Sequence, residues 1–126
     1  MKNLIPKIRK ILKDNHIDAI IIDNGDPHLS EYPHNYWKVR NWATGFTGSN
    51  GYAIISQNKA ALWTDSRYFI QAEQELDLSI FEIQKIGMPD STDILNWIRT
   101  NLNDKARISL NFQTSSYLFF LNLKQL

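Results

Sequence analysis

A polar and aromatic run, Asp26-Pro-His-Leu-Ser-Glu-Tyr32, is followed by His34 and holds the densest set of groups that could do chemistry. Asp26, His28, Glu31 and His34 are residue types that bind divalent metals, but their spacing matches no established motif such as HExxH. The structural alternative is that Asp and Ser cap turns of a loop while the histidines are solvated or hydrogen bonded. The spacing favours this structural interpretation. Because no serine lies in a GxSxG sequence, a serine hydrolase is also disfavoured.

A glycine-rich segment, Thr44-Gly-Phe-Thr-Gly-Ser-Asn-Gly51, superficially resembles a phosphate-binding loop. It lacks the GK[ST] ending of a Walker loop, and its glycine spacing is not the dinucleotide fingerprint. It also neither follows a predicted strand nor opens a predicted helix, as such loops do. The glycines instead predict positive φ angles and a close approach of the backbone where the loop enters a strand at Tyr52.

A third segment, Leu62-Trp-Thr-Asp-Ser-Arg-Tyr-Phe69, lies where a predicted strand ends and a predicted helix begins. In α/β folds the side chains at such strand ends face the ligand-binding crevice. Asp65 is placed to cap the helix. Arg67 either pairs with Asp65 or offers its guanidinium to a carboxylate or carbonyl of a ligand, and the sequence leaves both roles open.

The elements that must position these groups follow from apolar periodicity. Residues 4–12 predict an amphipathic helix, and the β-branched run 19–22 predicts a central strand covered on both faces. Residues 51–56 and 60–64 predict a hairpin with its turn at 57–59, so the sheet must be mixed. Asp65 or Ser66 is expected to cap the helix over 68–76, and Asp90 or Ser91 the helix over 94–102. The other predicted elements are a short helix at 36–42, strands at 78–83 and 107–110, and a turn at 87–90.

Composition excludes several function classes. The 126 residues suit one domain, and the absence of cysteine excludes a disulfide scaffold, a thiol nucleophile and thiolate metal sites. A net charge of +1 without a basic block argues against a nucleic-acid partner. The first helix is basic enough to lie on a membrane, but its short stripe without Trp or Phe favours packing on a core. The sequence lacks the unbroken apolar run that would indicate a signal peptide or a membrane span, so a cytoplasmic protein is expected.

Three motifs in order resemble the N-terminal domain of Xaa-Pro aminopeptidases, the creatinase-type N-terminal domain. They are the 26–32 run with its HxSEY pattern, Arg40 with the Gly45–Gly51 segment, and Ala61-Leu-Trp-Thr-Asp-Ser-Arg-Tyr-Phe-Ile-Gln-Ala72. The HxSEY pattern is similar to the three-domain type, and the resemblance spans residues 17–110. Ser66 replaces the usual glycine of the family's DGRY element, and Ser109-Leu-Asn111 replaces a common Gly-Val-Asp.

The resemblance implies a single domain over 1–126 with a three-layer α/β/α fold, a mixed sheet and a ribonuclease H-like motif. The family removes the N-terminal residue that precedes proline, using two Mn²⁺ ions in a C-terminal pita-bread domain. That domain lies outside this chain, so no catalytic residue, metal or cofactor is expected here, and the chain alone should not hydrolyse peptides. Its implied role is to wall the cleft, restrict access to short peptides, and contact its own catalytic domain and a second subunit of a homodimer.

By similarity, Arg67 is the residue expected nearest the peptide, and His28, Arg40 and Tyr68 are expected on the same substrate-binding face. Each of these three could equally hold the long loop together. The alternative is a free-standing interaction domain that binds a partner through exposed aromatics such as Trp37, Trp42 or Phe120. Binding of a creatine-like molecule rests on shared fold alone. The apolar segment 115–126 ends without a stop signal, so we expect a longer parent protein; a gene ending near Leu126 would favour the interaction domain.

Overall fold

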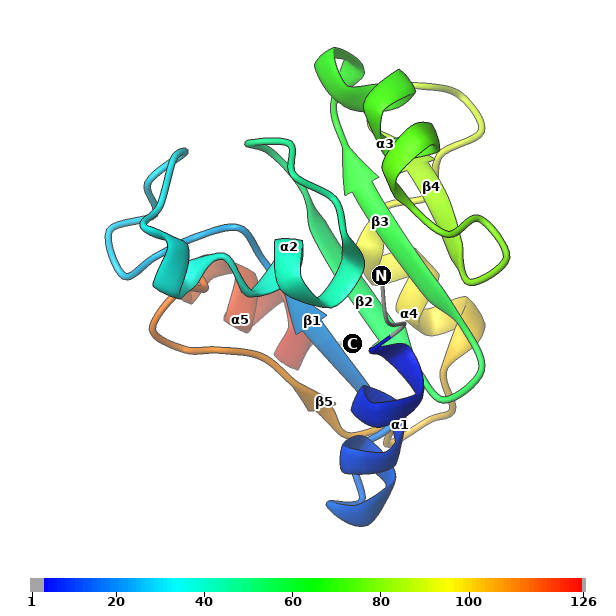
Figure 1. The fold of residues 1–126 in the computed structure, drawn as a ribbon. Helices are drawn as coiled ribbons and strands as arrows, with labels where there is room; N and C mark the ends of the chain where they lie inside the picture. Colours follow the sequence, from blue (N-terminus) through cyan, green and yellow to red (C-terminus); the bar gives the residue numbers. More distant parts are fainter. Residues whose placement is uncertain (1–3, 126) are drawn as a thin grey trace.

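The computed structural model describes residues 4–125 and is built on a five-stranded sheet with the order β4-β3-β2-β1-β5 (Figure 1). Strand β2 runs antiparallel to β1 and β3. The two outer strands are parallel to their neighbours: β5 pairs with β1, and β4 pairs with β3. The mixed sheet predicted from the hairpin is therefore confirmed. The strands are β1 Ala19–Ile22, β2 Tyr52–Ser56, β3 Ala60–Thr64, β4 Phe81–Lys85 and β5 Ile108–Ser109.

Helices cover both faces of the sheet, which gives the expected three layers (Figure 1). One face packs against α1 (Ile5–Asp14), α2 (Val39–Thr44) and α3 (Phe69–Glu75). The other packs against α4 (Ile94–Asn101) and α5 (Tyr117–Lys124). Within residues 4–125, no helix is long and apolar enough to cross a bilayer.

The central strands are apolar on both faces because each face meets a helical layer. In β2 and β3, Ile55 and Leu62 are buried toward the first layer, while Ile54 and Trp63 are buried toward the second. Trp63 packs edge-on against Trp97 of α4, with ring centroids 6.0 Å apart. The structure thus explains why the strands appear as continuous apolar runs in the sequence.

One predicted strand start and one predicted helix cap are wrong, and local side-chain hydrogen bonds account for both. The fourth strand begins at Phe81 rather than at residue 78, because Asp77 Oδ1 accepts hydrogen bonds from the backbone and hydroxyl of Ser79 and holds that segment in a turn. The N-cap of α4 is Asp93 rather than Asp90 or Ser91, since Asp93 Oδ1 accepts from the Asn96 N–H at 3.0 Å.

Other elements match the predictions with changes of length. The short helix expected at 36–42 is a 3₁₀ turn, Asn35–Trp37, followed by α2. The helix expected at 68–76 begins with a second 3₁₀ turn, Ser66–Tyr68, before α3. The last strand is shorter than 107–110 and consists of Ile108–Ser109.

The antiparallel centre of the sheet determines where the loops meet. Strands β1 and β3 both end at the edge of the sheet where β2 begins. The segments that follow β1, precede β2 and follow β3 therefore lie side by side at this edge. They are the three segments that carry the sequence motifs, so sheet topology alone brings the motifs together (Figure 1).

Candidate functional site

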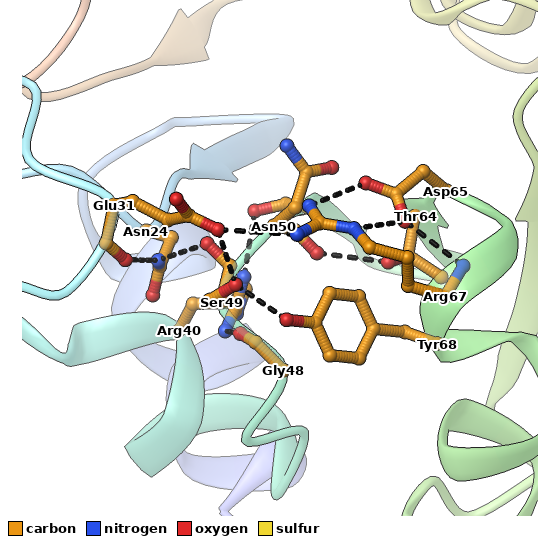
Figure 2. A network of polar contacts seen from close by, with 11 residues as sticks. Asn24, Glu31, Arg40, Gly48, Ser49, Asn50, Thr64, Asp65, Arg67 and Tyr68 are labelled. Atoms are coloured by element: carbon orange, nitrogen blue, oxygen red, sulfur yellow. Dashed lines mark hydrogen bonds and ion pairs between the residues drawn. The ribbon is translucent and has the colours of Figure 1, made fainter.

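Arg67 lies in the 3₁₀ turn after β3, and carboxylates hold it from two sides (Figure 2). Asp65 caps the turn as predicted: it accepts from the Arg67 backbone N–H at 3.0 Å and from its Nε and Nη2 at 3.1 and 2.9 Å. Glu31 accepts from Nη1 at 3.2 Å. The Arg67 guanidinium lowers the pKa of Asp65, and both carboxylates raise the pKa of Arg67. The structure thus shows the Asp65–Arg67 pair, one of the two roles that the sequence left open for Arg67.

Glu31 reaches Arg67 because a serine of the glycine-rich loop fixes it. Ser49 Oγ donates to Glu31 Oε1 at 2.8 Å, and this bond, followed by that from Arg67, holds the pKa of Glu31 below its usual value. The same hydroxyl contacts the Tyr68 hydroxyl. The Tyr68 ring lies beneath the Arg67 guanidinium, 5.0 Å from its Cζ. Arg67 is thus fixed in plane and direction although its side chain remains 53% exposed.

The glycines before β2 act as the sequence predicted. Gly45 ends α2 with a φ of 81° and Gly51 enters the strand with a φ of 135°. A Cβ at Gly51 would clash with the carbonyl oxygen of Trp63 in the neighbouring strand. The backbone of β2 can therefore approach β3 closely at its first residues, which brings Ser49 next to Tyr68.

Arg40 lies behind this loop, with no accessible surface. Its Nη1 donates to the Gly51 carbonyl at 2.9 Å, its Nη2 donates to the Gly48 carbonyl, and Phe46 lies against its guanidinium at 4.8 Å. Burial lowers the pKa of Arg40 to about 10, so the side chain keeps its charge at neutral pH. Its position matches the second role considered for it, that of holding the loop.

The remaining candidates lie in the loop after β1. Asp26 Oδ1 accepts from the backbone N–H groups of His28 and Ser30 at 2.9 and 3.0 Å, and His34 Nδ1 accepts from the Tyr36 N–H at 3.2 Å. These are the turn and cap contacts of the structural interpretation. Over residues 4–125, no three His, Asp or Glu side chains are grouped so as to hold a metal ion. His28 is exposed in the same loop and does not line the hollow described below.

The three segments enclose a hollow of about 470 Å³, lined in part by Asn24, Glu31, Ser49 and Arg67. Arg67 has five N–H donors, of which three are used, one each on Nε, Nη1 and Nη2. Within the described part of the chain, two N–H groups therefore remain for a ligand. Because two carboxylates outweigh the single positive charge of Arg67, the site favours a carbonyl oxygen held by directed hydrogen bonds over a free anion.

Sequence reasoning missed two members of this network. Asn24 donates from Nδ2 to the backbone carbonyls of Glu31 and Ser49, at 3.1 and 2.8 Å, and joins the first two segments. Ser49 links Glu31 to Tyr68. Asn24 closely follows the predicted end of β1, so the sequence could have placed it at this edge of the sheet. The sequence could not have identified the carbonyl groups that it binds.

Comparison with known proteins agrees with this geometry. A family model described as the Creatinase/Prolidase N-terminal domain matches residues 5–126. The chain belongs to this family. The resemblance and the fold inferred from the three motifs are therefore confirmed.

Named relatives are much longer than this creatinase/prolidase N-terminal domain. Human Xaa-Pro aminopeptidase 2 is 36% identical over 82% of the chain and 15% of its own length. Xaa-Pro aminopeptidase 1 of Dictyostelium discoideum is 33% identical over 95% and 19%. The chain thus spans less than a fifth of these relatives.

Solved structures agree in fold. The X-prolyl aminopeptidase of Caenorhabditis elegans, described as a cytosolic enzyme with a di-nuclear active site, matches with a TM-score of 0.82 at 32% identity, over 86% of this chain and 18% of that one. A domain of a dipeptidase from Streptococcus thermophilus matches over 99% and 87%, with a TM-score of 0.63. At 20% identity, the latter shows the fold alone.

Proposed function

We propose that this chain is the non-catalytic N-terminal domain of a Xaa-Pro aminopeptidase, which removes the N-terminal residue preceding a proline. Family membership, the names of the relatives and the small share of their length that is covered support this proposal. The catalytic domain would lie in another part of the same protein and be the principal partner of this domain. We also propose that the full-length enzyme is a homodimer in the cytoplasm.

The hollow around Arg67 would form one wall of the peptide cleft. The observation that carries this role is a guanidinium fixed by two carboxylates, with two N–H groups still available beside an open hollow. A peptide carbonyl would accept from these groups, and Tyr68 would support the guanidinium from below. His28, exposed in the loop after β1, would contact the peptide only outside the hollow. Arg40, being fully buried, would act through the loop rather than by contact.

The metals of the proposed reaction would be bound elsewhere. Residues 4–125 offer no suitable group of ligands, so the residues present do not fit a metal and we derive no catalytic step from them. The two Mn²⁺ ions would be held by the catalytic domain, where they would activate the attacking hydroxide. This domain would contribute peptide orientation and restriction of access.

The test uses the complete gene product and a peptide with proline in second position. Arg67→Ala should lower kcat/KM about tenfold or more, the value of one charge-assisted hydrogen bond, with most of the loss in KM. Arg99→Ala removes an exposed arginine of α4 that does not line the hollow; it is the matched control and should behave as wild type. Unchanged kinetics for Arg67→Ala would contradict the assigned role. The 126-residue chain alone with Mn²⁺ should show no cleavage.

A second candidate, a partner-binding domain, is favoured by one observation. Trp42 on α2 is 64% exposed, which is unusual for a tryptophan in a monomer. Trp37 and Phe120, the other aromatics expected to be exposed, are half-buried. A complete gene product that cleaves no Xaa-Pro peptide, yet loses a partner on Trp42→Ala, would support this alternative over the first.

A further inference from the structure

Every carbonyl oxygen of the 48–51 loop accepts a hydrogen bond from a side chain of another segment (Figure 2). Arg40 donates to the first and the last of the four. Asn24 donates to the second and Thr64 to the third, both at 2.8 Å. A loop of this kind is rigid because each peptide plane is fixed from outside, and among residues 4–125 Arg40 alone donates to it at both ends.

The environment of Arg40 shows that its charge is directed at the backbone. Among residues 4–125, no carboxylate lies within ion-pair distance of it. Its other contacts are the Asn41 side chain at 3.0 Å and the face of Phe46. A fully buried guanidinium is costly to desolvate, so its hydrogen bonds to the loop carbonyls must offset that cost. The forked guanidinium reaches the two carbonyls, three residues apart, with two separate nitrogens, a geometry that the single nitrogen of a lysine does not reproduce.

The loop in turn touches both carboxylates that hold Arg67, one directly and one through its neighbour. Ser49 donates to Glu31, whose Oε1 accepts from Arg67. Thr64, which is bonded to the third loop carbonyl, immediately precedes Asp65. A shift of the loop would therefore move both anchors of the exposed guanidinium.

We propose that Arg40 is a positioning residue for Arg67: its buried guanidinium presets the 48–51 loop, and the loop sets Glu31 and Asp65 so that Arg67 points into the hollow. Its effect on peptide binding rests on the proposed function. Its effect on Arg67 does not, because the contacts lie within this chain.

The first test measures Arg67 directly in the 126-residue chain. The ¹⁵N–¹H signal of Arg67 Nε is recorded at mildly acidic pH, where guanidinium exchange with water is slow. Arg40→Lys keeps the charge but replaces the two forked nitrogens with one, and should speed exchange of that proton roughly threefold or more, as expected when a fixed side chain gains freedom. Ser49→Ala breaks the same chain of contacts at a half-exposed position and should act in the same direction even where Arg40→Lys fails to fold.

Arg9→Lys is the matched control. Arg9 also donates to a backbone carbonyl, that of Ser56 at 2.7 Å, but at the opposite end of β2. It should leave the Arg67 signal unchanged. An unchanged Arg67 signal in folded Arg40→Lys, or in Ser49→Ala where Arg40→Lys does not fold, overturns the proposal, as does an equal response to Arg9→Lys.

The second test separates this proposal from the proposed function in the complete gene product. If Arg67→Ala leaves KM unchanged, peptide binding by Arg67 is wrong, whereas the exchange result still decides the positioning role. If Arg67→Ala raises KM, folded Arg40→Lys should raise it in the same direction with kcat less affected. A wild-type KM for Arg40→Lys beside a raised one for Arg67→Ala would overturn the proposal.

Discussion

Arg40 and Arg67 differ in almost every respect except their chemistry. Arg40 has no accessible surface and donates mainly to backbone carbonyls, while Arg67 is half-exposed and pairs with two carboxylates. Burial lowers the pKa of the first, and its carboxylate partners raise the pKa of the second. The difference separates two tasks: the Arg40 guanidinium holds the 48–51 loop in place, and that loop helps to orient the Arg67 guanidinium.

The two environments also predict different responses to substitution. Removing a buried donor leaves carbonyl groups unpaired without access to water, which costs free energy of unfolding. Removing an exposed ion pair costs little, because water replaces the partner and salt already screens it. Stability should therefore depend on Arg40, and ligand contact on Arg67.

The largest expected effect tests this division directly. Arg40→Met should lower the free energy of unfolding by roughly 2 to 4 kcal/mol, since the carbonyls of Gly48 and Gly51 lose their buried partner. Arg67→Met should leave the unfolding midpoint within error of wild type. Urea unfolding of both chains, followed by circular dichroism, measures the difference. Equal losses for the two variants would remove the distinction.

A smaller effect sharpens the comparison on the loop itself. Gly51→Ala should cost roughly 1 to 3 kcal/mol, because a Cβ at positive φ would also clash with the Trp63 carbonyl. Gly87 is a matched control, with a φ of 91° but no atom within 4 Å of the position that a Cβ would take. Gly87→Ala should therefore cost only the strain, about 1 kcal/mol. Thermal unfolding of both variants checks this order, and a larger loss at Gly87 would contradict it.

The smallest expected effect concerns Asp23, which directly follows β1. Burial raises its pKa despite hydrogen bonds from Gly25, Thr114 and Ser115. The folded chain then keeps a proton that the unfolded chain has lost, so Asp23 contributes less stability as pH rises from the unfolded pKa through the folded one. Asp23→Asn cannot ionise and should gain stability relative to wild type over that rise. Urea midpoints measured from acid to neutral pH would refute this if the two curves ran parallel.

Local contacts of the site could be predicted from the sequence, and distant ones could not. Asp65 and Arg67 are two residues apart at a strand end, so the cap and the pair follow from spacing. Glu31 is 36 residues from Arg67, and no pattern in the sequence joins them. Arg40 lies in a short predicted helix between two tryptophans, and nothing in that pattern indicates that the arginine itself is buried. Its role depends on loop carbonyls that become neighbours only after the sheet forms.

The fold shows the same division. Apolar runs and the hairpin turn predicted the strands of the central sheet, because both depend on residues adjacent in sequence. The predicted start of β4 was wrong because Asp77 and Ser79 form a turn that competes with the strand. Side-chain capping of this kind depends on conformation as well as residue type, so several aspartates and serines in one segment are equally good candidates.

The polar edge of the sheet also bears on strand alignment. Strands β1 and β2 are apolar on both faces, so shifting their pairing register by one residue would still bury apolar side chains. The hydrophobic pattern therefore opposes such a shift only weakly. Such a slip would separate Asn24 from Ser49, whose contact holds only while Ile22 stands opposite Ala53. The hydrogen-bond network around Arg67 therefore favours one pairing register of β1 and β2 among several that would bury the apolar side chains equally well.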